Sequence, residues 1–408
     1  MNMATFESLN QALKQAVDDG VFAGANLFAR NKSGTLRYSN AVGRRSLAEG
    51  SNEPMQENTV LAIASATKLI TSISALQLVE RGLIKLDDDV LDIVPLLAQQ
   101  EVFVAADDNK DTTTEKRKTP ITLRQLLTHS AGCAYSVMNP RIDTWRAANG
   151  LAVGSGGTFE ERIVQPLAFQ PGTSWEYGTG IDWVGRIVEN LSGQSLDEYA
   201  KVNILAPLGI KDFTFWIDKH PDMKSRLAKM TIRSGYPKPT GPAADYNGPL
   251  ITDGLKDCFG GHGGFGDLSQ YIEILYSLLV DDEKLLKKST TAQLFSPQLS
   301  AEESKRTLSH ETGKKDSLFI GEFLDTGDYD WGLGGLLIGQ DLPGWRRKGR
   351  MIWSGLPNVF WFIDREAGIC GVFGTQLLPP GDKQCMKVIT HFEKAVYSEA
   401  EALQKSKL

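Results

Sequence analysis

The chain has 408 residues, a formal net charge of −6 and 41% hydrophobic residues, a composition typical of a globular protein without a nucleic-acid-binding face. No apolar run is long enough to span a membrane, and the start lacks the basic and apolar segments of a secretory signal, so we expect an intracellular protein with no membrane partner. The four cysteines are scattered and the five histidines show no metal-ligand spacing, which predicts buried free thiols, no bound metal and no cofactor.

Both ends of the chain carry strand patterns. Residues 6–16 have apolar side chains at helical spacing, and strand patterns follow at residues 22–30 and 35–42 around a turn at Gly34. Near the other end, strand patterns separated by turn signals precede an amphipathic helix at residues 382–405; these patterns are residues 331–338, 350–353, 359–364 and 369–375. Because hairpins pair strands in antiparallel fashion, we expect one antiparallel sheet with the terminal helices on one face.

The middle of the chain is mainly helical in pattern. Helical spacing is found at residues 123–128, 181–191 and 271–279, and polar segments at residues 107–118 and 300–317 are expected to be loops.

These patterns predict an α/β fold of the α+β kind, with an antiparallel sheet, flanking terminal helices and an inserted helical lobe. We expect a single catalytic domain spanning residues 1–408. Residues 1–60 and 320–408 would form the sheet lobe, and residues 61–319 the mainly helical lobe. Such an arrangement leaves a cleft between the lobes.

Ser65 and Lys68 stand three residues apart at the start of a helical pattern that ends at Gly82. Residues at this spacing share a helix face, so Lys68 is expected to lie beside Ser65. A lysine whose pKa is lowered by burial can take the proton of a serine hydroxyl, and N–H groups at a helix start can stabilise an oxyanion. The same spacing also arises by chance, so the interpretation depends on its position and on the motifs that follow.

Other catalytic arrangements have less support. No serine lies in a Gly-x-Ser-x-Gly motif, which argues against an α/β-hydrolase. We expect His129 and His262 to be supporting or turn residues rather than general bases.

Four blocks of sequence, in this order, resemble the serine β-lactamase and penicillin-binding-protein superfamily, and within it the class C β-lactamase-like esterases and transesterases. They are residues 61–68 (LAIASATK), 121–132 (ITLRQLLTHSAG), 170–178 (QPG before WEYG) and 260–265 (GGHGGF). Residues 345–349 and 355–358 are in addition similar to the fungal statin side-chain acyltransferases. The resemblance covers nearly the whole chain and implies a β-lactamase/penicillin-binding-protein-like fold with Ser65 as nucleophile.

The resemblance assigns Tyr177 to the tyrosine that moves protons between the nucleophile and the incoming or leaving group. Beside Lys68 such a phenol can be held as a phenolate, which is a base. Tyr38 fits the Tyr-x-Asn form of this motif better, but it precedes the nucleophile in a strand pattern, so Tyr177 is favoured. The chain departs from the β-lactamases at Thr179, where they carry an asparagine.

A second departure is at Trp353, which with Ser354 and Gly355 matches the Lys-Thr-Gly strand of the β-lactamases. An indole in place of a cation favours an apolar or uncharged acyl chain and argues against β-lactamase activity. Gly355 would let a strand N–H approach the oxyanion beside that of Ser65, although purely structural roles for Trp353 and Gly355 stay open. Tyr135 is expected either to line the acyl or acceptor pocket or to pack.

The function expected is that of an acyltransferase, with fungal secondary metabolism as the implied setting. It would form a serine acyl-enzyme from an acyl thioester, either acyl-CoA or a carrier-protein-bound acyl group, and pass the acyl group to an alcohol or amine of a small metabolite. The alternative is a carboxylesterase of the same fold, because transfer and hydrolysis share the first half-reaction. A non-catalytic binding relative would be expected to lack Ser65, Lys68 or Tyr177.

The last three residues are Ser406, Lys407 and Leu408, the tripeptide that peroxisomal import receptors read at a C-terminus. We therefore expect a peroxisomal protein with the import receptor as a partner, and a cytoplasmic protein as the alternative. Because peroxisomes handle acyl-CoA thioesters, this address favours acyl-CoA as the donor.

Overall fold

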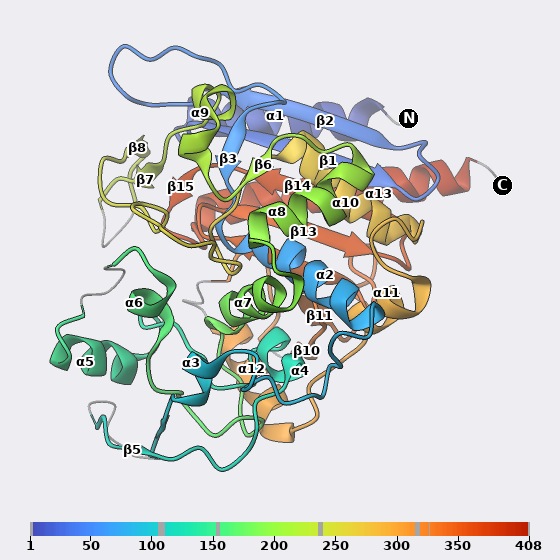
Figure 1. Ribbon diagram of the computed structural model, residues 1–408. Coiled ribbons are helices and arrows are strands. Elements are labelled where there is room, and N and C mark those ends of the chain that lie inside the picture. Colours follow the sequence, from blue (N-terminus) through green and yellow to red (C-terminus); the bar gives the residue numbers. More distant parts are fainter. Residues whose placement is uncertain are drawn as a thin grey trace.

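A seven-stranded antiparallel sheet forms the centre of the computed structural model, which describes residues 3–104, 111–151, 156–235, 240–314, 319–325 and 327–406 (Figure 1). The strand order is β10-β11-β12-β13-β14-β1-β2, so the first strand of the chain, β1, lies between β14 and β2. The strands are β1 Gly24–Asn31, β2 Arg37–Gly43, β10 Tyr329–Trp331, β11 Leu336–Ile338, β12 Met351–Gly355, β13 Val359–Asp364 and β14 Ile369–Gly374. The expected antiparallel sheet built from both ends of the chain is confirmed.

Helices cover both faces of this sheet: α1 (Met3–Asp18), α13 (Lys383–Lys405) and α10 (Leu268–Val280). Gly371 faces Phe392 of α13, whereas Gly374, three residues further along β14, faces Leu268 of α10. Because side chains alternate along a strand, α13 and α10 lie on opposite faces. Helix α1 packs beside α13, as expected for terminal helices that share a face.

The middle of the chain supplies most of the remaining helices, among them α2, which follows Ser65. They are α2 Thr67–Glu80, α3 Pro95–Ala98, α4 Leu123–Leu127, α5 Pro140–Ala148, α6 Phe159–Ile163, α7 Gly180–Ser192, α8 Leu196–Ala200, α9 Pro221–Ser225, α11 Lys288–Leu294 and α12 Glu302–Gly313. As predicted, Gly82 takes a left-handed conformation (φ 72°) just beyond α2. At the start of α4, Thr122 and Gln125 form a capping box.

Short strands also occur in the middle of the chain. One three-stranded sheet has the order β3-β9-β6 (Val60–Ala62, Phe265–Asp267, Phe213–Thr214), and another has the order β15-β7-β8 (Leu377–Leu378, Thr231–Arg233, Ala243–Asp245). Helix α10 of this middle segment packs on the central sheet. The boundaries of a sheet lobe at residues 1–60 and 320–408 and of a helical lobe at residues 61–319 stay a prediction.

Two expected elements were wrong. Residues 331–338 form the hairpin of β10 and β11 rather than one strand, because Gly332 N–H donates to the Gly335 carbonyl (2.9 Å) and turns the chain. Residues 300–317 contain helix α12 rather than a loop, and residues 315–317 lie outside the described residues. Within the loop expected at residues 107–118, residues 107–110 also lie outside the description, and β5 (Thr114–Glu115) pairs with β4 (Val102–Phe103).

The four cysteines are buried and carry free thiols, as predicted. A search of the described residues finds no helix with the length and apolarity that a membrane crossing requires. Of the C-terminal tripeptide, Ser406 caps α13 and is exposed, whereas Lys407 and Leu408 lie outside the described residues.

Candidate active site

Ser65 lies in a short 3-10 turn (Ala64–Ala66) that leads from β3 into α2. The preceding residue, Ala64, has a φ of 44°, a left-handed conformation that is uncommon for a residue with a side chain. The Thr67 hydroxyl holds this turn, since it donates to the Ala64 carbonyl (2.6 Å) and accepts from the N–H of Gly264 (3.0 Å). The turn thus presents Ser65 directly ahead of α2, where the N–H groups of Ala66 and Thr67 already donate to the carbonyls of Ile63 and Ala64.

Lys68 lies one turn further along α2, and its side chain is buried. Its Nζ is 3.3 Å from Ser65 Oγ, 3.0 Å from the Tyr135 hydroxyl oxygen and 2.7 Å from the carbonyl oxygen of Gly261. Burial lowers the pKa of the Lys68 amine to about 7, although the Asp182 carboxylate opposes this shift. A sizeable share of Lys68 is therefore neutral near pH 7 and able to accept the serine proton.

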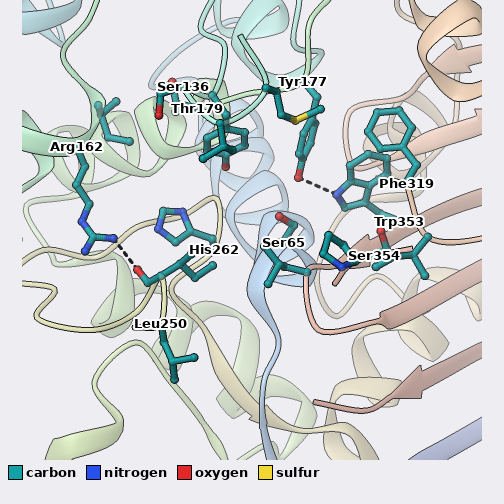
Figure 2. A pocket seen from close by; sticks show the side chains of 18 of the residues that line it. Ser65, Ser136, Arg162, Tyr177, Thr179, Leu250, His262, Phe319, Trp353 and Ser354 are labelled. Carbon is teal, nitrogen blue, oxygen red and sulfur yellow. Dashed lines mark hydrogen bonds between the residues drawn. The ribbon is translucent and has the colours of Figure 1, made fainter. Parts of the chain in front are cut away.

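Tyr177 lies beside this pair, with its ring centre 4.7 Å from Lys68 Nζ. Its hydroxyl oxygen accepts a hydrogen bond from the indole Nε1–H of Trp353 (3.2 Å; Figure 2). Burial raises the pKa of the Tyr177 phenol, although hydrogen bonds with Ser65 and Trp353 oppose the shift. The raised pKa favours a neutral Tyr177 hydroxyl, which can donate a proton, over the phenolate that the sequence allowed.

The alternative tyrosine, Tyr38, lies away from this site. It stacks on Phe6 of α1 at 4.3 Å between ring centres, and its hydroxyl donates to Asn10 Oδ1 (2.8 Å). Of the two tyrosines that the sequence offered, the structure brings Tyr177 to Ser65.

Gly355 ends β12 directly beside the nucleophile segment. A Cβ atom at this position would lie 2.1 Å from the carbonyl oxygen of Ile63, which explains why a glycine is needed here. The close approach brings β12 against the turn that carries Ser65. An oxyanion role for the Gly355 N–H stays a prediction, and on this strand Trp353, Ser354 and the following Leu356 line the cavity.

A cavity of about 380 Å³ opens from Ser65, with Tyr177 and Trp353 on one side and His262 on the other (Figure 2). Its wall is largely apolar; beyond the residues already named it includes Met138, Ile163, Leu250, Ile251, Phe319 and Ile320. Thr179 and Tyr135 also line it. An apolar cavity with a few convergent polar groups is typical of a small-molecule site.

The two histidines of the family-like blocks, His129 and His262, are buried. Burial lowers the pKa of His129 well below its ordinary value, and its ring packs 4.7 Å from that of Tyr177 while Nδ1 accepts from the N–H of Gly178 (3.3 Å). Burial also lowers the pKa of His262 to about 3. These lowered pKa values favour neutral side chains, and a supporting rather than basic role for both stays a prediction.

Sequence reasoning missed Asp182, a fully buried carboxylate in the first turn of α7. It accepts a hydrogen bond from the N–H of Gly261 (2.8 Å) and lies 3.5 Å from the Tyr135 hydroxyl. Burial raises its pKa to about 6, while the positive charge of Lys68 opposes the shift. A single acidic residue between the apolar residues Ile181 and Trp183 is the signal that could have revealed it.

Comparison with known proteins identifies the family. The model of the family described as Beta-lactamase matches residues 9–391. The chain belongs to the beta-lactamase family. Monacolin J acid methylbutanoyltransferase of Aspergillus terreus is 35% identical to this beta-lactamase family member over 402 residues, 96% of the chain and 95% of the relative. Lovastatin esterase of Penicillium rubens is 37% identical over 384 residues, 93% of the chain and 94% of the relative.

Among solved structures, simvastatin synthase (LovD) of Aspergillus terreus, in its LovD6 mutant form, superimposes with a TM-score of 0.89. It is 35% identical, and the match covers 97% of this chain and 95% of that one. The expected β-lactamase/penicillin-binding-protein-like fold is confirmed. The chain is thus an enzyme of this family, among relatives named acyltransferases and esterases.

Proposed function

We propose that this protein is a serine acyltransferase that takes an acyl group from a thioester onto Ser65 and passes it to a hydroxyl or amine of a small metabolite. The observation that carries the proposal is the buried Lys68 amine, 3.3 Å from Ser65 Oγ, whose pKa burial lowers to about 7. Fungal secondary metabolism is the setting suggested by relatives such as monacolin J acid methylbutanoyltransferase.

The reaction divides into two similar steps. Ser65 Oγ attacks the thioester carbonyl as its proton passes to Lys68, and the backbone N–H groups of Ser65 and Gly355 stabilise the oxyanion. When the tetrahedral intermediate collapses, the C–S bond breaks and the leaving thiolate takes a proton through the Tyr177 hydroxyl. In the second step the acceptor hydroxyl or amine attacks the Ser65 ester and its proton passes to the Lys68 and Tyr177 pair. The bond between Ser65 Oγ and the acyl carbon then breaks, and the pair returns the proton to Ser65 Oγ.

The cavity wall supports an apolar acyl group. Trp353 and Phe319 pack against each other (5.3 Å between ring centres) and both face the cavity beside Ser65. A β-lactam carboxylate would meet an indole there instead of a cation, and would lose a charge-assisted hydrogen bond of roughly 1.5–3 kcal/mol. A branched or straight aliphatic acyl chain loses no such contact.

A second candidate function is hydrolysis of small esters. The observation that favours it is the 37% identity to a relative named lovastatin esterase. Transfer and hydrolysis share the acyl-enzyme and differ in whether water or the acceptor takes the acyl group.

The proposal is tested by mixing the protein with butyryl-N-acetylcysteamine and measuring the intact mass. A gain of one butyryl group on a peptide that contains Ser65, absent in Ser65→Ala, is expected. Label confined to a cysteine would overturn the assignment of the nucleophile. Adding a polycyclic alcohol should then divert the acyl group from butyrate to an ester, whereas butyrate release indifferent to every acceptor would favour the esterase.

We further propose that the protein is imported into peroxisomes through residues 406–408 and uses acyl-CoA there. The support is the sequence of the tripeptide and the exposure of Ser406 at the end of α13. A fluorescent protein fused to the N-terminus should coincide with a peroxisomal marker in a fungal cell and become diffuse when residues 406–408 are removed. Diffuse fluorescence from the intact fusion would contradict the proposal.

A further inference from the structure

Asp182 is a buried charged group at the site that the acyl-transfer steps leave without a role. Resting on the function proposed above, we propose that Asp182 is a positioning residue that aims the Lys68 amine at Ser65 by holding two of the three groups that, among the described residues, lie within hydrogen-bond distance of the amine. The two are the Gly261 peptide and the Tyr135 hydroxyl, and the third is Ser65 itself.

Asp182 first fixes the peptide of Gly261 by a hydrogen bond. Its N–H donates to Asp182 Oδ1 (2.8 Å), and its carbonyl accepts from Lys68 Nζ (2.7 Å), so one residue joins the carboxylate to the amine. A Cβ atom on Gly261 would lie 2.4 Å from Asp182 Oδ2, which shows how closely the carboxylate packs on this backbone. The carbonyl that receives Lys68 is thereby set in one orientation.

Asp182 also orients the hydroxyl of Tyr135. Its hydroxyl lies 3.0 Å from Lys68 Nζ and 3.5 Å from Asp182 Oδ2. A carboxylate accepts hydrogen bonds and does not donate them, so the Tyr135 proton is directed to Asp182 and its oxygen lone pairs are left for Lys68. Tyr135 is therefore an acceptor toward the amine, beyond the lining or packing role expected from the sequence.

These two acceptors define where the lone pair of Lys68 points. A neutral primary amine has two N–H bonds and one lone pair in a tetrahedral arrangement. With the Gly261 carbonyl and the Tyr135 oxygen each taking one N–H, the lone pair is left for the remaining neighbour, Ser65 Oγ, at 3.3 Å. That is the orientation a general base needs to receive the serine proton.

The negative charge of Asp182 also favours transfer of the serine proton to Lys68. The titratable groups that face it are Lys68, Tyr135, Tyr177, His262 (Nδ1 at 3.6 Å) and Cys133. Burial keeps His262 uncharged and raises the pKa of Cys133 to about 12, so at neutral pH the cation in this group is the protonated Lys68. Asp182 thus stabilises the ammonium that forms when Ser65 gives up its proton.

The test compares Asp182→Asn with Tyr135→Phe, using the rate of Ser65 acylation by butyryl-N-acetylcysteamine across pH 5 to 10. In D182N the amide can donate to Tyr135 and reverse the direction of its hydroxyl, so the plateau rate should fall by about 10²-fold. The rise of the acylation rate on the acidic side of the pH profile (the acid limb) should also shift to lower pH by about one unit. The reason is that the negative charge that raises the pKa of Lys68 is lost.

Y135F should lower the plateau but leave the acid limb in place, since it keeps the carboxylate. The double variant should be no slower than D182N, because the two residues act as one unit. Asp267→Asn serves as the matched control: Asp267 is also buried, but it caps α10 by accepting from the N–H of Ser269. Asp267→Asn should at most lower the thermal stability, and it should leave the pH profile of Ser65 acylation unchanged.

The outcomes separate this inference from the function on which it rests. If the wild-type protein fails to acylate Ser65, the proposed function itself is refuted. If the wild-type protein acylates but folded D182N keeps the wild-type plateau and acid limb, the positioning role is refuted. A plateau loss with an unmoved acid limb in D182N would likewise contradict the role of the charge.

Discussion

Replacing Gly355 with alanine should slow acylation far more than it harms the fold. The added Cβ would lie 2.1 Å from the Ile63 carbonyl oxygen, so β12 and the turn that carries Ser65 must separate by at least about 1.3 Å to reach ordinary van der Waals contact at 3.4 Å. Misplacing reacting groups by this distance costs about 10²-fold in rate. Crowding of this kind costs roughly 1–3 kcal/mol of folding free energy, which a chain of this size generally survives.

The assay is the burst of thiol released from butyryl-N-acetylcysteamine in a single turnover, alongside the thermal unfolding midpoint. Gly266→Ala is the matched control, because Gly266 lies in strand β9 and its added Cβ would be 3.4 Å from the nearest atom, Phe213 Cδ2. G266A should acylate at close to the wild-type rate. A folded G355A that acylates as fast as G266A would refute the view that contact between β12 and the nucleophile turn sets the geometry.

Further predictions concern the proton path, the donor and the buried charges. The rate of acylation in the wild-type protein should rise with pH through about 7, because Lys68 must be neutral to accept a proton; a rate independent of pH from 5 to 9 would contradict this. Trp353→Phe removes the N–H that donates to Tyr177 and should slow turnover by about 2- to 10-fold with little change in the unfolding midpoint. Nitrocefin should be turned over much more slowly than the acyl thioester, and efficient hydrolysis would refute the substrate assignment. Glu393→Gln should destabilise the fold by about 3–5 kcal/mol, measured by urea unfolding, because buried Arg346 and Arg350 lose their counter-ion, while the folded fraction keeps its acylation rate.

The central pair of the site could be predicted because it depends on local geometry alone. Ser65 and Lys68 are three residues apart on one helix, and this spacing places them together in any helical conformation. Tyr177, by contrast, comes from a distant segment, and it was chosen over Tyr38 through the resemblance to a family and the position of Tyr38 before the nucleophile in a strand pattern. Asp182 was missed because its importance depends on Gly261, which is far along the chain and invisible to any pattern of spacing.

The errors in the fold have similar causes. Helix α12 was taken for a loop because its buried side is built from Ser304, Leu308 and Thr312, of which only one is apolar, so the hydrophobic period was absent. The hairpin of β10 and β11 was taken for one strand because apolar residues flank its turn on both sides. The glycines at residues 332, 334 and 335 were the signal of a turn within that run.

The order of strands in the central sheet has a consequence for biosynthesis. Strand β1 pairs with β14, and the wall of the cavity beside Ser65 comes from β12, so both wait for the last hundred residues to leave the ribosome. Until then the hairpin of β1 and β2 has an open edge that can pair with other chains. A polypeptide that ends before β12 would therefore carry Ser65 and Lys68 in adjacent helical turns but would lack the part of the cavity wall that Trp353 and Ser354 form.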